Sequence, residues 1–370
     1  MATDIVIVYT PVGGGHKAAA MALGEAAKAR GHRVLLLDLF ESAPAIIGAT
    51  YQSAHLGGTT ITPNFYGRSY FAANRRDGAF EPLRRGFDHV AFAGIVNRVC
   101  DAQAHSVIAT HHLPLVVLGR ARRLGWLDAP LTGVITDYTA HACWAEPGVD
   151  AFCVPCPSAA RELEAHGIPR AMMTETGIPV RPAFASTPDV CMDPGEPLRV
   201  LVTSGSFGVG PMEAIIRSFR GIRDVELTVV CGSKRGATAR ASRVAATAGV
   251  PVRVLGFEHD MAARVRDAHV VVGKAGGLTV TETMAAGRPM ILVGTVPGNE
   301  LSNERLVVRG GAGYAAAPSE VGAIVDAMRE RGVIAEMGRR ARQLVLTDGA
   351  ARVLDVALGM AEQRTRGRAA

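Results

Sequence analysis

A histidine at the end of a glycine-rich turn is the first residue whose type and position suggest chemistry. An apolar run over 5–9 is typical of a fully buried strand, and the turn TPVGGGH leads from it into an alanine-rich helix. His16 would therefore begin a helix directly after a strand, where a neutral imidazole can accept a proton at neutral pH. We predict that His16 is a general base. Asp137 also follows a predicted strand, 131–135, and is the alternative base.

The stretch 270–303, VVVGKAGGLTVTETMAAGRPMILVGTVPGNELSN, is the second region with chemical character. A buried strand over 270–272 is followed by the glycine turn KAGG and by a predicted helix over 278–286. Thr279 and Glu282 have the spacing of a capping box, with Thr279 as the N-cap. Glycines let the backbone approach a ligand, and the free N–H groups of a helix start suit phosphate. With the polar loop PGNE after the next strand, the pattern favours a nucleotide-sugar site.

Length and composition set the class of protein. A chain of 370 residues with 48% hydrophobic and 20% charged residues is expected to form two globular domains. It has no apolar run of about 18 residues, and it starts directly with a strand, so we expect neither a transmembrane helix nor a secretory signal. The six scattered cysteines favour the cytoplasm, and the lone CxxC at Cys153 and Cys156 is interpreted as structural.

The order of elements predicts two similar halves. Strands and helices alternate from residue 4 onward, and an apolar strand over 198–202 followed by a glycine-rich loop restarts the pattern. We predict an α/β fold of two Rossmann-like domains facing each other across a cleft. The expected division of the chain is 1–183 for the N-terminal acceptor-binding domain, 184–197 for a linker, 198–350 for the C-terminal donor-binding domain, and 351–370 for a closing helix and tail.

The segment 41–98 differs in composition, because aromatic residues alternate there with arginines. The aromatic residues are Tyr51, Phe65, Tyr66, Tyr70, Phe71, Phe80, Phe87 and Phe92, and the arginines are Arg68, Arg75, Arg76, Arg84 and Arg85. Rings at headgroup level with arginines against anionic lipid are typical of an interfacial membrane surface. A helical insert whose aromatic side chains pack in its own core is the alternative. The net charge of +6 fits an anionic membrane or an anionic substrate, and no motif supports nucleic acid.

Several motifs together carry a family resemblance. KAGGLTVTETMAAGRPMIL with PGNELSN, GGGHKAAA, TDYTAHACW, GIPVRP and GFEHDM resemble glycosyltransferase family 28 over most of 4–315. The resemblance is strongest to the branch of monogalactosyldiacylglycerol synthases and processive diacylglycerol glucosyltransferases. It implies the GT-B fold, an inverting transfer of a hexose from a UDP-sugar, and a lipid hydroxyl as acceptor. It also favours the membrane interpretation of 51–92, which lies near the lipid acceptor in those synthases.

The resemblance and the motif positions together assign residues to the donor. Amides of the second glycine turn and of the loop after residue 202 would meet the diphosphate, Glu282 would accept from the ribose, and GFEHDM would hold the uracil. Asn299 and Glu300 would bind the sugar hydroxyls, although the relatives carry Gln-Glu there, which leaves the sugar open. The predicted donor residues are Gly15, Ser204, Gly205, Phe257, Glu258, Gly276, Gly277, Leu278, Thr279, Glu282, Asn299, Glu300 and Asn303.

The acceptor side and the cofactor follow from the same reasoning. His111, at a predicted strand end, joins His141 and Trp144 of the TDYTAHACW motif as acceptor-binding candidates. No Asp-x-Asp motif occurs in the chain, so we expect no metal and no other cofactor, with helix-start amides meeting the charge on UDP. A soluble small-molecule acceptor, a UDP-sugar 2-epimerase and a non-enzymatic nucleotide-sugar sensor are the alternative functions.

Overall fold

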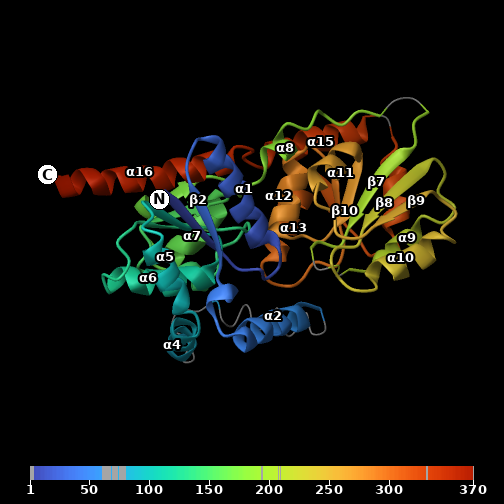
Figure 1. Cartoon of the computed structure of the whole chain (residues 1–370). Helices are drawn as coiled ribbons and strands as arrows, with labels where there is room; N and C mark the ends of the chain where they lie inside the picture. Colours follow the sequence, from blue (N-terminus) through green and yellow to red (C-terminus); the bar gives the residue numbers. More distant parts are fainter. Residues whose placement is uncertain are drawn as a thin grey trace. The chain divides into compact units, whose positions relative to one another are not determined.

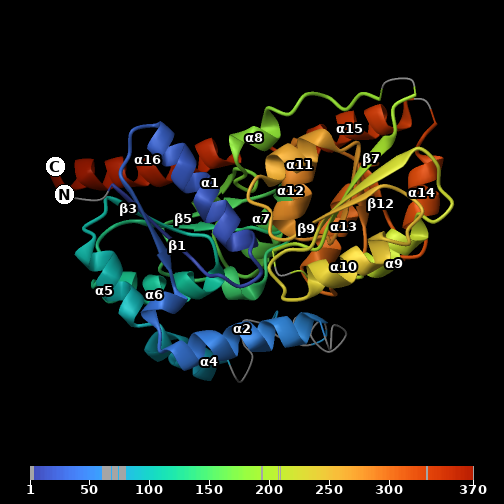
Figure 2. The same cartoon turned by 45° about the vertical axis from the view of Figure 1, so that its right-hand side comes forward.

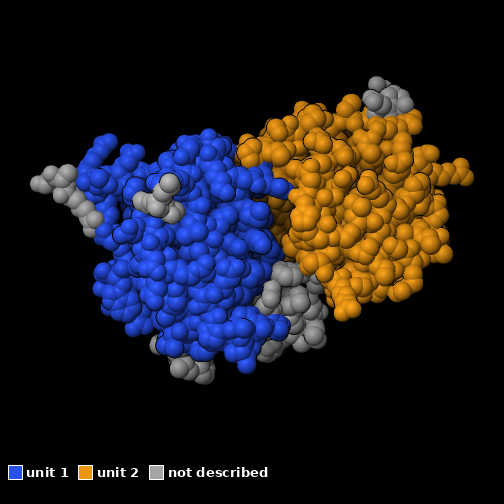
Figure 3. All heavy atoms as spheres, in the orientation of Figure 1, with its two compact units in different colours: residues 1–181, 297–299, 348–370 blue, residues 182–296, 300–347 orange. Residues whose placement is uncertain are grey.

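The computed structural model divides the chain into two compact units. It describes residues 4–60, 68, 74, 81–192, 195–206, 208, 210–330 and 332–369. Unit 1, blue in Figure 3, consists of Met1–Arg181, Pro297–Asn299 and Asp348–Ala370, and unit 2, orange, consists of Pro182–Val296 and Glu300–Thr347. The last helix of the chain thus belongs to the unit that contains the first strand.

Unit 1 is built on a six-stranded parallel sheet with the order β2-β1-β3-β4-β5-β6. Its strands are β1 (Ile5–Tyr9), β2 (Val34–Asp38), β3 (Ser106–Ala109), β4 (Leu131–Val134), β5 (Ala151–Val154) and β6 (Met173–Glu175). The helices around it are α1 (Gly15–Ala29), α2 (Ala45–Thr60), α4 (Glu81–Ala91), α5 (Gly94–Asp101), α6 (His112–Arg123), α7 (Pro157–Ala165) and α16 (Gly349–Ala369). Both faces of the sheet are buried, as the continuous apolar strands predict.

The two faces of this sheet are covered by different helices. Ile5, Ile7 and Ile108 pack with residues of α1 and α16, whereas Val6 and Val107 pack with residues of α5, α6 and α7. In Figures 1 and 2, α1 and α16 run along the same side of the sheet. Layers of helices on both faces leave the strand ends as the places where loops can bind a ligand.

Unit 2 repeats this plan with the strand order β12-β11-β10-β7-β8-β9. Its strands are β7 (Leu198–Thr203), β8 (Val225–Val230), β9 (Val252–Leu255), β10 (Val270–Gly273), β11 (Met290–Leu292) and β12 (Gly313–Ala315). Its helices are α8 (Pro182–Ala185), α9 (Met212–Ser218), α10 (Ala237–Ala245), α11 (Met261–Asp267), α12 (Gly277–Ala285), α13 (Glu300–Arg309), α14 (Val321–Ala327) and α15 (Val333–Gln343). The predicted α/β class, with two parallel sheets, is confirmed.

One detail of the sequence prediction is wrong. Helix α12 does not begin at Thr279: its N-cap is Gly276, whose extended backbone (φ −68°, ψ 139°) carries no capping side chain. Thr279 lies inside the first turn, where its carbonyl accepts a hydrogen bond from Thr283 Oγ1 at 2.7 Å. The capping-box spacing occurs by chance, because the glycine turn enters the helix three residues earlier than the pattern suggested.

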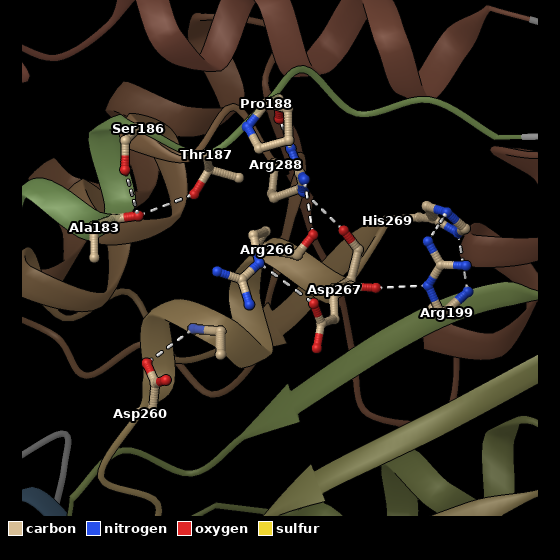
Figure 4. A network of polar contacts seen from close by, with 12 residues as sticks. Ala183, Ser186, Thr187, Pro188, Arg199, Asp260, Arg266, Asp267, His269 and Arg288 are labelled. Carbon is tan, nitrogen blue, oxygen red and sulfur yellow. Dashed lines mark hydrogen bonds and ion pairs between the residues drawn. The ribbon is translucent and has the colours of Figure 1, made fainter.

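A buried arginine binds Pro188, in the segment expected to be a linker, which lies within unit 2. Arg288, 3% exposed, donates hydrogen bonds of 2.7–2.9 Å to the carbonyls of Pro188, Arg266, Ala268 and Ala286. Figure 4 shows Arg288 beside Pro188 and Arg266. Burial is the main cause that lowers the pKa of this guanidinium to about 10, so it stays charged at neutral pH. The expected linker is therefore tied down by hydrogen bonds near its start, where α8 also forms.

The arginine- and aromatic-rich segment is partly core and partly surface. Phe92 is fully buried, and its ring centroid lies 5.8 Å from that of Phe40 and 6.4 Å from that of Tyr51. On α4, by contrast, Phe87 is 54% and Val90 81% exposed. The other aromatic residues expected to form a membrane surface, Phe65, Tyr66, Tyr70, Phe71 and Phe80, lie outside the described residues, as do Arg75 and Arg76. Within the described part of the chain, no helix has the length and apolarity needed to cross a bilayer.

Candidate functional site

The strand order of unit 1 brings three loops together at one edge of the sheet. β3 lies between β1 and β4, and all three strands are parallel. His16 follows β1, Thr110 follows β3, and Thr136 with Asp137 follows β4. Because parallel strands end at the same edge, residues far apart in the sequence become neighbours there.

His16 is held by hydrogen bonds on its ring and on its main chain. Its Nδ1 lies 2.9 Å from the carbonyl oxygen of Thr110 and 2.9 Å from Thr136 Oγ1, and Thr110 Oγ1 donates to the His16 carbonyl at 2.9 Å. Part of the residue reaches solvent, but burial of the ring lowers the pKa of His16 to about 4. The imidazole is therefore neutral at pH 7, as a general base requires.

Two of the residues predicted to bind the acceptor substrate are N-caps of helices. His111 Nδ1 accepts from the Leu113 N–H at 3.1 Å and caps α6, and His141 Nδ1 accepts from the Cys143 N–H at 3.1 Å. The His111 ring also packs edge-on against His16, with 4.4 Å between centroids. Trp144 is buried, and its ring lies 6.1 Å from that of His112, a residue that the sequence prediction omitted.

Asp137 and the loop that carries it are also positioned by hydrogen bonds. Asp137 Oδ2 accepts from Asn299 Nδ2 at 2.9 Å, and Asn299 counts with unit 1. Glu162 of α7 accepts from Thr139 Oγ1 at 2.7 Å and from the Ala140 N–H at 2.6 Å. The sequence prediction did not include Glu162, because it lies in an ordinary amphipathic helix, where a glutamate side chain is normally exposed to solvent.

In unit 2, the start of α12 offers backbone N–H groups to an anion. No side chain caps this helix, whose first residues include Gly277, Leu278 and Thr279. The positive end of a helix with free amides binds phosphate well. The Gly205 N–H, in the neighbouring loop after β7, contacts Thr203 Oγ1 at 3.2 Å, and Ser204 Oγ donates to the Val230 carbonyl at 3.1 Å. Ser204 is thus fixed to β8 by its hydroxyl.

Helix α13 holds the glycine turn after β10. Asn303 is fully buried and donates to the Ala275 carbonyl at 2.8 Å, and Glu300 lies 3.5 Å from Lys274 Nζ. Glu300 also accepts from the Val296 N–H at 2.7 Å. Glu300, which was expected to bind sugar hydroxyls, is therefore already paired with Lys274 and the Val296 N–H, and Asn303 is bonded to the glycine turn.

The remaining donor candidates are Phe257 and Glu258 in the loop after β9, Glu282 in α12, and Gly15 at the start of α1 in unit 1. Phe257 is 52% exposed, and its ring centroid lies 5.0 Å from that of His259. Glu258 accepts from the Asp260 N–H at 3.0 Å and from Arg264 Nε at 2.9 Å, and these hydrogen bonds lower the pKa of its carboxyl. Glu282 is half-buried within α12. Gly15 is the first residue of α1. The N-cap of this helix is Gly14, whose backbone is in the left-handed region, and no side chain caps it.

Two family models cover most of the chain. Residues 16–180 match the model for monogalactosyldiacylglycerol (MGDG) synthase, and residues 199–322 match the glycosyltransferase family 28 C-terminal domain. The chain belongs to glycosyltransferase family 28. It is an enzyme of the transferase class, as the sequence motifs predicted. The first match lies within unit 1, and the second match begins at residue 199, within unit 2.

Known relatives agree with this assignment. The processive diacylglycerol beta-glucosyltransferase of Bacillus thuringiensis (strain Al Hakam) is 25% identical over 318 residues, covering 83% of this chain and 80% of that protein. The probable monogalactosyldiacylglycerol synthase 2 of Oryza sativa subsp. japonica is 28% identical over 354 residues, covering 84% and 70%. The structure of Acinetobacter baumannii MurG is similar in fold, with a TM-score of 0.63 at 17% identity over 96% of this chain and 99% of that one. The predicted GT-B fold is thereby confirmed.

The lowered pKa of His16 predicts an unusual pH profile for this glycosyltransferase. If His16 is the base, kcat/KM falls only as pH drops through the pKa of about 4, and not near the ordinary value of about 6.5. Initial rates measured from pH 7 downward test this, with circular dichroism at each pH to confirm folding. An acidic limb centred near 6.5 contradicts the prediction.

The same shift has a consequence for stability. Between about pH 6.5 and pH 4 the unfolded chain binds a proton at His16 that the folded protein does not, so this residue destabilises the fold as pH falls through that window. A His16→Gln variant provides the control. Its free energy of unfolding should fall less than that of the wild type as pH drops from about 6.5 to about 4.

Proposed function

We propose that this family 28 enzyme transfers a hexose from a UDP-sugar to the hydroxyl of diacylglycerol or a similar lipid, with inversion at the anomeric carbon. The observation that carries the proposal is the neutral His16, held at the end of β1 in the domain that matches the MGDG synthase model. Similarity to two lipid glycosyltransferases over more than four-fifths of the chain supports the acceptor class.

The proposed donor site lies in unit 2. The uncapped start of α12 suits the diphosphate, and the exposed ring of Phe257 provides an apolar surface within the segment GFEHDM proposed for the uracil. Lys274, at the start of the glycine turn, and Glu300, at the start of α13, lie 3.5 Å apart, and hydroxyls of a glucose or galactose would find both a donor and an acceptor there. We place glucose and galactose ahead of N-acetylglucosamine, because both curated relatives are named for transfer of a hexose.

The proposed chemistry needs one proton transfer. The acceptor oxygen attacks C1 of the hexose from the face opposite UDP, its proton passes to His16, and the C1–O bond breaks with the electron pair leaving on UDP. Positive helix ends and basic side chains would stabilise the charge that develops on the diphosphate. Asp137 is the alternative base, and its carboxylate is oriented by Asn299.

A product assay with a histidine variant tests the proposal. We expect UDP release and a glycolipid product when the protein is incubated with UDP-glucose or UDP-galactose and diacylglycerol in mixed micelles. His16→Ala should lower kcat by about 10²–10⁴-fold while the affinity for UDP-sugar stays nearly unchanged, because only the base is removed. The matched control is His32→Ala, a histidine outside the site. If His16→Ala has a normal kcat and Asp137→Asn is inactive, then Asp137 is the base and His16 is not.

We propose that transfer needs no divalent ion. The proposal rests on the absence of Asp-x-Asp from the sequence and on the uncapped helix starts, whose amides would replace a cation at the diphosphate. Turnover should therefore persist after exhaustive treatment with EDTA, and added magnesium should change it little. Activity that disappears with EDTA and returns only with magnesium or manganese argues against the proposal.

We also propose peripheral binding to an anionic, cytoplasm-facing membrane surface. Phe87 and Val90 are exposed one turn apart on α4, and the same helix contains Arg84 and Arg85. Binding to vesicles containing phosphatidylglycerol should weaken with salt and should fall in the Phe87→Ser/Val90→Ser variant. Trp126→Ser is the matched control, because Trp126 is exposed elsewhere in unit 1. A wild-type protein that ignores these vesicles at low salt points to a soluble acceptor.

A further inference from the structure

The hydrogen bonds of the His16 ring indicate which of its two nitrogens carries the proton. The ring nitrogen Nδ1 has two oxygen neighbours at 2.9 Å, the carbonyl of Thr110 and the hydroxyl of Thr136. A hydroxyl can donate or accept, but a carbonyl oxygen can only accept. The carbonyl therefore decides where the proton of a neutral imidazole lies.

We propose that Thr110 and Thr136 fix His16 in the tautomer with the proton on Nδ1, which leaves Nε2 as the atom that takes the acceptor proton. This inference rests on the proposed role of His16 as the base. If Nδ1 carried a lone pair, it would lie 2.9 Å from the carbonyl lone pairs with no proton between them, which is repulsive. With the proton on Nδ1, both oxygens accept, and the ring orientation is fixed.

The arrangement is reciprocal and rigid. Thr110 Oγ1 donates to the His16 carbonyl at 2.9 Å, so one threonine is bonded to both the ring and the main chain of the base. Thr110 and Thr136 are both buried, and each follows a strand of the parallel sheet. A flip of the imidazole would place carbon against both oxygens and lose both hydrogen bonds.

The arrangement also supports the proton transfer itself. When Nε2 takes the hydroxyl proton, the ring becomes an imidazolium whose Nδ1–H still points to two acceptors. Hydrogen bonds to a charged group are stronger than those to a neutral one, so both oxygens stabilise the charged ring more than the neutral ring. Thr136 is thus a positioning residue that acts through His16.

Kinetics of three threonine variants test the positioning role. Thr136→Val should lower kcat about 3- to 10-fold, the worth of one hydrogen bond, with the KM for UDP-sugar unchanged, and Thr136→Ser should restore kcat. Thr132→Val is the matched control, because Thr132 is buried in the same strand, β4, and its hydroxyl has no partner among the described residues. Wild-type kcat in Thr136→Val, or a rise in KM alone, overturns the role.

Nitrogen NMR tests the tautomer independently of activity. In protein labelled with ¹⁵N-histidine, the His16 signals are those absent from the His16→Gln variant, and we expect a protonated Nδ1 and an unprotonated Nε2 at pH 7. The opposite pattern overturns the inference even if His16→Ala is inactive. If instead the pattern is as expected but His16→Ala is fully active, the tautomer stands and the proposed base is wrong.

Discussion

The site in unit 1 depends on one geometric constraint, which is that parallel strands all end at the same edge of their sheet. Because β3 lies between β1 and β4, Thr110 is placed between the two loops that carry His16 and Thr136. No neighbouring pair in the sequence could make these contacts, since the residues lie 94 and 120 positions from His16. The imidazole is therefore oriented by the order of strands, and burial between the loops keeps it neutral.

In unit 2 the same strand geometry surrounds the glycine turn after β10 with other loops. β10 lies between β7 and β11, so the glycine turn after β10 has the loops of both neighbours beside it. Helix α13, which follows β11, fastens that turn through Asn303 and Glu300. The glycine turn has few side chains of its own, and hydrogen bonds from α13 keep its backbone in one arrangement.

Many of the residues expected to bind ligands already have hydrogen bonds inside the protein. Ser204, Glu258, Asn299 and Asn303 each contact a loop or a side chain of their own unit. Buried polar groups must be paired, because leaving them unpaired costs free energy. If unit 2 binds the donor as proposed, its loops are already ordered by these hydrogen bonds, so that less binding energy is needed to order them.

The sequence by itself determined the α/β class, the two halves, the family and strands such as those at 5–9, 131–135, 198–202 and 270–272, because apolar strands, glycine turns and motif spacing are local signals. It could not determine that Gly276 caps α12, since chance spacing imitated a capping box at Thr279. It also missed Thr110, Thr136 and Glu162, which are common residue types in ordinary positions. Only the tertiary structure placed them against His16 and its neighbouring loop, because hydrogen bonds between loops depend on strand order and on distances that no local pattern records.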